Sequence, residues 1–446
     1  TMHPATRRTV ESHARAFDAA LDTKYQDIFT TTSYLTGKKI FRFNSLMQSL
    51  EDIIYNSRFK RIMYHLTGTC SGALCVGWHA QNVLWNVTYE MDNELGTDYH
   101  NRLEENGLTV AGALTDAKGD RSLKPSQQED KISFLHISKV RKDGIEISGV
   151  KAMICGVAAA NEIFILPGSS YKEADKDCSV ACVIPRDIEG LTIVETRRPS
   201  DMREYEEGYE MPKTGITQAY LLFENVFVPK ERVFICGEYQ YSGKVIEYFT
   251  ANYRACIGAC VAGQGDVMIG AAALIARANG LSESIFMNKI IEMAINNETT
   301  FGMGIGSMAM GAKHSAGVWI ADSLLAHTNK VHVATLPYET KRLCQEIAGG
   351  IGETGCFPSY RDFMNSRYGK LIQRAIRASK NISAETRART ARLIEWLTIG
   401  AGVPGCMHGG GSPDGARMVI RYKLPIQEYI EYAKQIADIK EELSSR

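Results

Sequence analysis

The period of the apolar positions changes twice along the chain. It is helical over about the first 112 residues, where Phe17, Leu21 and Tyr25 recur at four-residue spacing. Between about residues 121 and 236 it shortens to the alternating or brief apolar runs of strands, at 132–137, 145–150, 162–166, 179–184, 191–194 and 220–228. Helical spacing then returns at 245–279, 283–311, 316–330, 340–348, 383–397 and 426–443. The pattern predicts an α+β protein with an N-terminal helical domain (1–120), a β domain (121–236) and a C-terminal helical bundle (237–446).

One common nucleotide-binding arrangement is missing from this pattern. A dinucleotide-binding fold opens with a strand, a glycine-rich turn and a helix. Here Gly263-Gln264-Gly265 lies inside a predicted helix. A nucleotide cofactor would therefore have to bind through loops and domain interfaces.

Composition narrows the kind of partner. Lys plus Arg number 51 and Asp plus Glu number 51, so the overall charge favours neither nucleic acid nor an anionic membrane. No run reaches the roughly 18 uninterrupted apolar residues of a membrane span. The 11 cysteines lie apart among apolar neighbours, unlike a secreted disulfide framework. We expect a cytoplasmic protein that acts on a small molecule, with mostly reduced and buried thiols.

The loop at 112–121 lies where the helical domain gives way to the β domain, and domain junctions favour ligands. Thr115 offers a hydroxyl, and Lys118 and Arg121 can meet a pyrophosphate through charge-assisted hydrogen bonds. The same composition also describes a solvated turn with ordinary charges.

Glycine clusters mark two further loops. The first, at 348–355, contains Gly349 and Gly350 and allows close approach to a bulky cofactor. The second, at 407–413, contains His408 followed by three glycines. Such clusters more often mark turns and helix caps, so neither is specific alone.

Eight blocks spread over the chain match one known family. They include Thr88-Tyr89-Glu90-Met91-Asp92 and Glu224-Asn225-Val226-Phe227-Val228-Pro229, and the remaining ones lie at 25–38, 75–77, 112–121, 265–274, 347–350 and 407–413. Together they resemble the 4-hydroxyphenylacetate 3-hydroxylase family of flavoproteins, and within it a branch of acyl-CoA dehydratases.

The resemblance implies an acyl-CoA-dehydrogenase-like fold with a middle β-barrel domain, a homotetramer and a bound FAD. It also implies that about thirty residues precede Thr1 in relatives. FAD would be held partly across subunits, by Leu114, Thr115, Lys118, Arg121, Cys155, Gly349, Gly350 and Thr354.

The chain departs from the dehydratase branch at an iron–sulfur site. That branch holds a 4Fe–4S cluster with three cysteines and one histidine, two of the cysteines in a C-x3-C pair. Cys75 aligns with one of the pair, but Cys70 is one residue too far away. We place the histidine at Ile295 and the last cysteine at Gly302, and a carboxylate base at Gly405, so we do not expect the 4Fe–4S cluster.

A different metal site is an alternative. The candidate ligands are Cys70, Cys75, His79, Cys256 and Cys260, provided that their helices meet. The competing interpretation is that these are ordinary core residues.

Two further departures concern the flavin surroundings. The hydroxylase branch uses a histidine near the flavin loop, and Gly112 stands in its place. A threonine that contacts flavin is replaced by Cys155, a weaker hydrogen-bond donor.

The polar residues left for catalysis are Glu247, Tyr253, Arg254 and His408, with Glu298 as a further candidate. In an apolar flavin pocket the pKa of Glu247 would be raised by desolvation, which suits proton transfer. A surface salt bridge is the equally weighted alternative.

These residues support a hypothesis of an FAD-dependent enzyme that acts on a small acyl substrate, such as a CoA thioester. The reaction would be dehydration, isomerisation or dehydrogenation at adjacent carbons. One alternative is a two-component monooxygenase that hydroxylates a phenol with flavin from a partner reductase. The other alternative is a noncatalytic paralogue.

Overall fold

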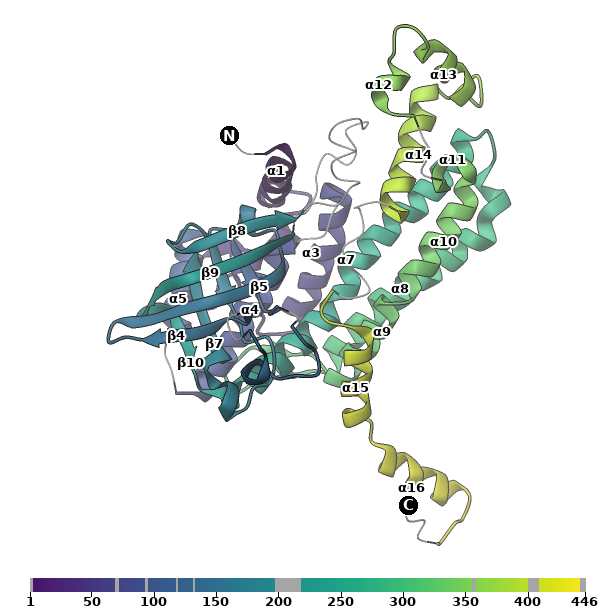
Figure 1. The fold of residues 1–446 in the computed structure, drawn as a ribbon. Coiled ribbons are helices and arrows are strands. Elements are labelled where there is room, and N and C mark those ends of the chain that lie inside the picture. The colour runs from purple at the N-terminus through teal and green to yellow at the C-terminus, as the bar shows by residue number, and fades with distance from the viewer. Residues whose placement is uncertain are drawn as a thin grey trace.

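Two β-sheets and a layer of long helices form the two halves of the computed structural model (Figure 1). The structure describes residues 3–68, 72–92, 95–117, 119–130, 133–196, 218–354, 358–399 and 409–441. The last two helices, α15 (Pro413–Lys423) and α16 (Ile426–Ile436), carry the C-terminus away from the rest of the protein (Figure 1).

The N-terminal helices enclose an aromatic core that includes Phe43 and Trp78 in edge-on contact. Helix α3 (Leu50–Thr67) begins at a capping box, in which Ser49 and Asp52 each accept a hydrogen bond from the other's backbone amide. The helix therefore begins at Leu50. The other elements of this part are α1 (Pro4–Ala19), α2 (Gln26–Phe29), β1 (Thr30–Thr32), β2 (Lys39–Phe41), α4 (Gly72–Glu90) and α5 (Leu95–Asn106).

The β domain is made of two four-stranded sheets. The first has the order β10-β7-β6-β3, with β3 parallel to β6, and the second has the antiparallel order β4-β5-β9-β8. The strands are β3 (Val110–Ala113), β4 (His136–Val140), β5 (Gly144–Cys155), β6 (Glu162–Ile165), β7 (Val180–Pro185), β8 (Leu191–Thr196), β9 (Gln218–Pro229) and β10 (Val233–Cys236).

The two sheets share one apolar core, which joins Ile163 of the first sheet to Leu221 of the second. The opposite face of the first sheet packs on α4, α5 and the start of α7 (Ser242–Ala278). The barrel that we expected is not confirmed, because the described strands form two separate sheets and no closed one. The α+β class is confirmed.

Helix α7 is the central element of the helical half and contacts α3, α4, α8, α9, α10 and α14. Gly263 and Gly265 lie within it, as predicted, and allow close contact with neighbouring helices: a Cβ at Gly263 would lie 2.4 Å from the Arg61 carbonyl oxygen, and one at Gly265 would lie 2.0 Å from Asn297 Oδ1. Tyr239–Ala278 is long and apolar enough to cross a membrane, but 67% of its most apolar window is buried in the protein. Packing therefore accounts for its hydropathy, and the cytoplasmic location stays a prediction.

The rest of the helical half follows the predicted spacing in part, and the helices at Tyr360–Phe363, Gly369–Ile376 and Pro413–Lys423 lie outside every range that the pattern predicted. Residues 316–330 were expected to be helical, but β11 (Ala312–Lys313) and β12 (Trp319–Ile320) form a short hairpin, and the Asp322 side chain caps α9 (Ser323–Val333). The other helices are α8 (Met287–Ala309), α10 (Leu336–Ala348), α11 (Gly350–Glu353), α12 (Tyr360–Phe363), α13 (Gly369–Ile376) and α14 (Ala384–Thr398).

Candidate functional site

The loop after β3 is fixed from below by a buried ionic cluster that we call the Lys151 network, made of Lys151, Asp116 and Tyr171. The Lys151 ammonium forms an ion pair with the Asp116 carboxylate and donates to the carbonyl oxygens of Leu114 (3.0 Å) and Leu166 (2.8 Å). The Tyr171 hydroxyl donates to Asp116 Oδ2 at 2.5 Å, and burial raises the pKa of that phenol. The network therefore holds the backbone at Leu114 in one position.

The same loop lies beside the end of β5. The Ala152 amide donates to the Thr115 carbonyl oxygen at 2.9 Å, and Cys155 is the last residue of the strand. Met153 has a positive φ of 58° at a register shift, which leaves its side chain exposed. Thr115 is half-buried, and its hydroxyl has no hydrogen-bond partner among the described residues. Leu114 and Thr115 thus belong to a loop that lies against β5, the strand that ends at Cys155.

The charged end of the loop is described only in part. Arg121 lies exposed in a turn, and Lys118 lies outside the described residues. Their assignment to a pyrophosphate stays a prediction.

Tyr253 and Arg254 lie on α7 under a glycine turn, Gly410 and Gly411. Both glycines have positive φ, and a Cβ at Gly410 would lie 2.8 Å from the Tyr253 ring. A Cβ at Gly411 would lie 2.7 Å from Arg254 Nη2. These close contacts explain why this loop needs glycine. His408, just before the turn, lies outside the described residues.

Arg254 is a buried cation whose charge is compensated by one carbonyl oxygen among the described residues. Its Nε donates to the Gly410 carbonyl oxygen at 2.9 Å, and no carboxylate pairs with its guanidinium in the described part of the chain. Burial lowers the pKa of Arg254 to about 10. An anionic or strongly polarised ligand group would satisfy this guanidinium.

Behind Tyr253, three helices enclose a buried lysine among thiols. We call this the thiol pocket, and its members are Lys60 of α3, Cys75 and His79 of α4, and Cys256 and Cys260 of α7. The Lys60 ammonium lies 2.9 Å from His79 Nε2 and 5.8 Å from the Tyr253 ring centroid, and the nearby Cys75 thiol acts to raise its pKa. The helices of the candidate metal ligands therefore do meet, whereas Cys70 lies outside the described residues.

Lys60 was missed from the sequence, although a signal was present. It lies on the same helical stripe as Ile53 and Tyr64, both fully buried, so a charged residue stands where the pattern requires an apolar one. A lysine in an apolar stripe is worth examining as a site residue.

The expected iron ligand positions are not near this pocket. Ile295 and Gly302 lie on the exposed face of α8, and nothing lies within 4 Å of a Cβ built at Gly302. The placement of the family's histidine and cysteine at these positions therefore has no support in the structure. The same spacing recurs between Tyr253 and Cys260 of α7, which do lie beside Lys60.

Two carboxylates proposed for catalysis lie at the surface. Glu247 Oε1 is 2.9 Å from Lys423 Nζ, with both side chains about half exposed, which is the salt-bridge alternative. Glu298 pairs with Arg61 at 2.5 Å. The described protomer provides no apolar pocket around either carboxylate.

The glycine loop that contains Gly349 and Gly350 lies far from the first sheet. Gly349 precedes α11, which packs on α10 and α14 at the end of the helical half away from β5 (Figure 1). Gly349 and Gly350 are exposed, and the Thr354 hydroxyl donates to the Gly350 carbonyl oxygen at 2.9 Å. Their assignment to the flavin therefore stays a prediction, one that needs a second copy of the chain.

Gly112 has no room for the histidine of the hydroxylase branch. A Cβ there would lie 2.5 Å from Val76 Cγ1 and 2.9 Å from the Val76 carbonyl oxygen. The close approach of β3 to α4 thus counts against phenol hydroxylation.

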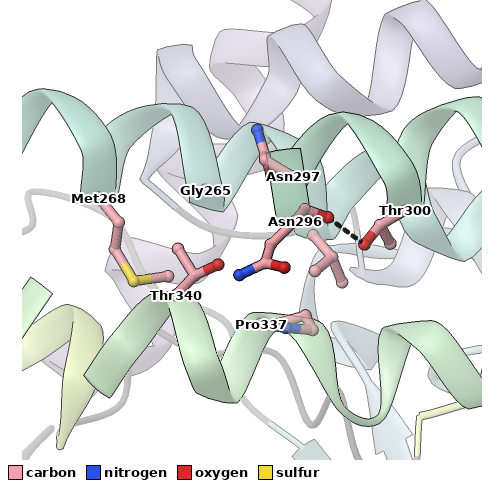
Figure 2. Close-up of a pocket in the computed structure, with 8 residues that line it drawn as sticks. Gly265, Met268, Asn296, Asn297, Thr300, Pro337 and Thr340 are labelled. Carbon is pink, nitrogen blue, oxygen red and sulfur yellow. Dashed lines mark hydrogen bonds between the residues drawn. The ribbon is translucent and has the colours of Figure 1, made fainter. Parts of the chain in front are cut away.

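A small cavity lies elsewhere in the helical half, between α7, α8 and α10 (Figure 2). Figure 2 shows the Asn296 amide beside Thr340 and Pro337, and its Nδ2 has no partner among the described residues. The cavity is about 10 Å³, where one water needs roughly 10–15 Å³. It is too small for a substrate.

Comparisons with known proteins agree over the whole chain. The chain is 37% identical over 462 residues to "4-hydroxybutyryl-CoA dehydratase/vinylacetyl-CoA-Delta-isomerase" of Clostridium aminobutyricum, covering 98% of this chain and 94% of that protein. The "oxygen tolerant" archaeal 4-hydroxybutyryl-CoA dehydratase of N. maritimus superposes with a TM-score of 0.95 at 35% identity, covering 99% of this chain and 90% of the other.

More distant structures agree in fold. The oxygenase component of 4-hydroxyphenylacetate 3-monooxygenase, solved with FAD and 4-hydroxyphenylacetate, gives a TM-score of 0.81 at 18% identity, over 98% of this chain and 93% of the other. Glutaryl-coenzyme A dehydrogenase gives a TM-score of 0.56 at 13% identity, over 94% of this chain and 95% of the other, which confirms the acyl-CoA-dehydrogenase-like fold.

The family assignment rests on both halves of the chain. The profile described as "4-hydroxyphenylacetate 3-hydroxylase N terminal" matches residues 1–235, and its C-terminal counterpart matches residues 242–438. The chain belongs to the 4-hydroxyphenylacetate 3-hydroxylase family.

Proposed function

We propose that the protein is an FAD-dependent enzyme that dehydrates or isomerises a small acyl-CoA thioester. The relative from Clostridium aminobutyricum, whose name combines these two reactions, is similar over nearly its full length. The phenol-hydroxylating relatives match less well, at 24% identity over 53% of this chain for one of them. The inaccessible Gly112 position supports the same choice.

The residues around the Lys151 network fit a flavin. The backbone at Leu114 is fixed, the Thr115 hydroxyl is available, and the Cys155 thiol accepts from Gln218 Nε2 at 3.6 Å on the neighbouring wall. We assign Lys118 and Arg121 to the pyrophosphate. When bound, FAD supplies an electron-accepting ring system for a hydride or electrons from the carbon β to a thioester.

The exposed loop at Gly349, Gly350 and Thr354 completes the flavin site in this proposal from a second copy of the chain. That arrangement requires an oligomer, and a homotetramer is the form that we propose. A mass measurement in solution tests it, since a monomer would leave the loop without a flavin to contact.

The observation that carries the proposed function is the buried Arg254 guanidinium, which has a single carbonyl partner among the described residues. Loss of a proton from the carbon α to a thioester places negative charge on the thioester oxygen. A preorganised cation in a water-poor site stabilises such an oxyanion more than it stabilises the neutral ester. Arg254 is suited to this role.

Proton movement completes a double-bond shift. In a β,γ-unsaturated thioester, the α C–H bond breaks, the electron pair delocalises toward oxygen, and the γ carbon gains a proton. No net oxidation occurs, so the reaction needs no external oxidant. We assign proton movement to Tyr253, beside Arg254, and to His408, before the glycine turn.

The experiment is an anaerobic assay of the flavin-loaded protein with two substrates, vinylacetyl-CoA and 4-hydroxybutyryl-CoA, followed by chromatography of the CoA esters. Turnover of either ester supports the proposal. A parallel assay with reduced FAD, oxygen and 4-hydroxyphenylacetate is the comparison. Failure on both esters together with hydroxylation of the phenol would overturn the proposal.

A further inference from the structure

Lys60 is an unusual buried cation because its neighbours are neutral at their ordinary protonation. It is fully buried, and no carboxylate pairs with it in the described part of the chain. Its contacts are the His79 imidazole at 2.9 Å and the face of the Tyr253 ring, and the Cys75 thiol interacts with it electrostatically. A buried ammonium needs such partners, because isolation from water is costly.

Lys60 and the residues around it shift one another's pKa values. Burial acts to lower the pKa of Lys60, but the three thiols of the pocket oppose this and shift it upward. Burial raises the pKa of Cys256, with Lys60 acting in the opposite direction. The pKa of His79 is well below its usual value, because of burial and the nearby ammonium. The pocket thus holds one cation that is shared among thiols and a neutral imidazole.

This arrangement does not fit the iron–sulfur cluster that the family resemblance implies. A cluster requires thiolates that converge on a common centre. Within the described ranges, no three histidine, cysteine or acidic side chains are grouped to hold a metal ion. Instead, the Lys60 ammonium contacts His79 and interacts electrostatically with Cys75, the α4 candidates for ligation.

We propose that Lys60 is the resident cation of the thiol pocket and that its ammonium keeps metal ions and iron–sulfur clusters away from the Cys75, Cys256 and Cys260 thiols. The proposal rests on the position of Lys60 and is independent of the proposed acyl-CoA chemistry. It also predicts that removing the lysine converts the pocket into a site for a thiophilic cation. His79 Nδ1, which is buried and has no described partner, borders that space.

Anaerobic titration of the full-length, flavin-loaded protein with cobalt chloride tests this inference, with thiolate-to-cobalt charge-transfer absorption as the readout. The wild-type protein is expected to show no tight binding. K60A is expected to bind about one equivalent of Co²⁺ through its thiols. K60A/C256S/C260S is expected to lose this absorption, which would place the metal among the thiols.

Two control variants separate the effect of the lost Lys60 charge from the effect of a disturbed protein core. K60R retains a cation and is expected to behave like the wild type. K330A removes another fully buried lysine, on α9, and is expected to bind no cobalt. Each variant is first checked for cooperative unfolding.

Two results would overturn the proposal. One is a wild-type protein that takes up cobalt, or iron and sulfide on reconstitution, in a form that C256S/C260S abolishes. The other is a folded K60A that binds no cobalt. If K60A does not fold, the wild-type titration still decides whether the lysine excludes metal.

Discussion

Lys151 and Lys60 are both fully buried, yet their surroundings differ in kind. Lys151 meets a carboxylate and two backbone carbonyl oxygens. Lys60 meets an imidazole and an aromatic face, with thiols that interact with it electrostatically. The first set carries a fixed opposite charge, whereas the second set carries charge only when a thiol ionises. One buried lysine can thus hold a backbone segment in one position, whereas another lies in a pocket whose charge changes with the ionisation of its thiols.

The largest effect should come from breaking the fixed pair. K151M leaves the Asp116 carboxylate buried with Tyr171 as its remaining described side-chain partner, and we expect a loss of about 3–5 kcal/mol of unfolding free energy. Urea denaturation measures it. K151M/D116L removes both charges and should recover most of the loss. Equal losses in both variants would show that the ion pair is not the cause.

Arg254 extends the comparison to a buried cation whose described partner is a single carbonyl. If a developing oxyanion is its natural partner, R254Q should lower turnover of the acyl-CoA substrate by about 10²–10³-fold. Flavin content and unfolding should change little. R254K retains the charge and should lose less activity. Unchanged turnover in R254Q would remove Arg254 from the reaction.

His13 is a buried titratable residue that has no charged partner among the described residues. Both of its ring nitrogens lack partners among the described residues, and burial lowers its pKa from 6.5 to about 4. Because the folded-state pKa is the lower one, its contribution to stability is complete above pH 6.5 and is lost as the pH falls toward 4. Between pH 7 and pH 5 this one group should cost about 2 kcal/mol.

The measurement is the urea unfolding free energy at both pH values, in wild type and in H13L. H13L has no titratable group at this position. Its unfolding free energy should therefore fall by about 2 kcal/mol less than that of the wild type between pH 7 and pH 5. Parallel declines would show that His13 is already charged in the folded protein.

A smaller effect on the unfolding free energy is expected at Lys60. K60M removes a cation without stranding a buried carboxylate, and methionine fills a similar volume, so unfolding free energy should change by less than about 1.5 kcal/mol. The contrast with K151M is the direct test of the comparison. A loss as large as that of K151M would mean that the thiols carry a full negative charge.

The smallest effect is expected at the surface. E247Q breaks the ion pair with Lys423, which is about half exposed, and should change stability by less than about 0.5 kcal/mol. Turnover should stay within about threefold of wild type, a change below 1 kcal/mol. A hundredfold loss would instead restore the proton-transfer role that the sequence suggested.

Local periodicity was enough to predict much of the fold. The strands at 162–166 and 179–184 and the helix at 245–279 agree with β6, β7 and α7 to within a few residues. The hairpin at β11 and β12 was missed because its register depends on contacts outside the segment, such as the Trp319 amide donating to the Met47 carbonyl oxygen. Periodicity carries no information about such partners.

The candidate site was less predictable, because it is assembled from distant segments. The loop that contains Thr115 lies against β5, which ends at Cys155, but the assignment of both residues to a flavin stays a prediction. Ile295 was taken as a ligand position from the family resemblance, but it lies on the exposed face of α8, whereas the equivalent spacing on α7 lies beside Lys60. Lys60 could be located only once α3, α4 and α7 were seen to meet.

The parallel pairing of β3 with β6 has a kinetic consequence. The loop that carries Thr115 follows directly after β3, so its shape depends on a strand that has to find a partner beyond β4 and β5. Parallel pairing across an intervening pair of strands is a non-local and comparatively slow step in folding. Flavin fluorescence should therefore change late in refolding, after helix formation is complete, and so report when β3 has paired with β6.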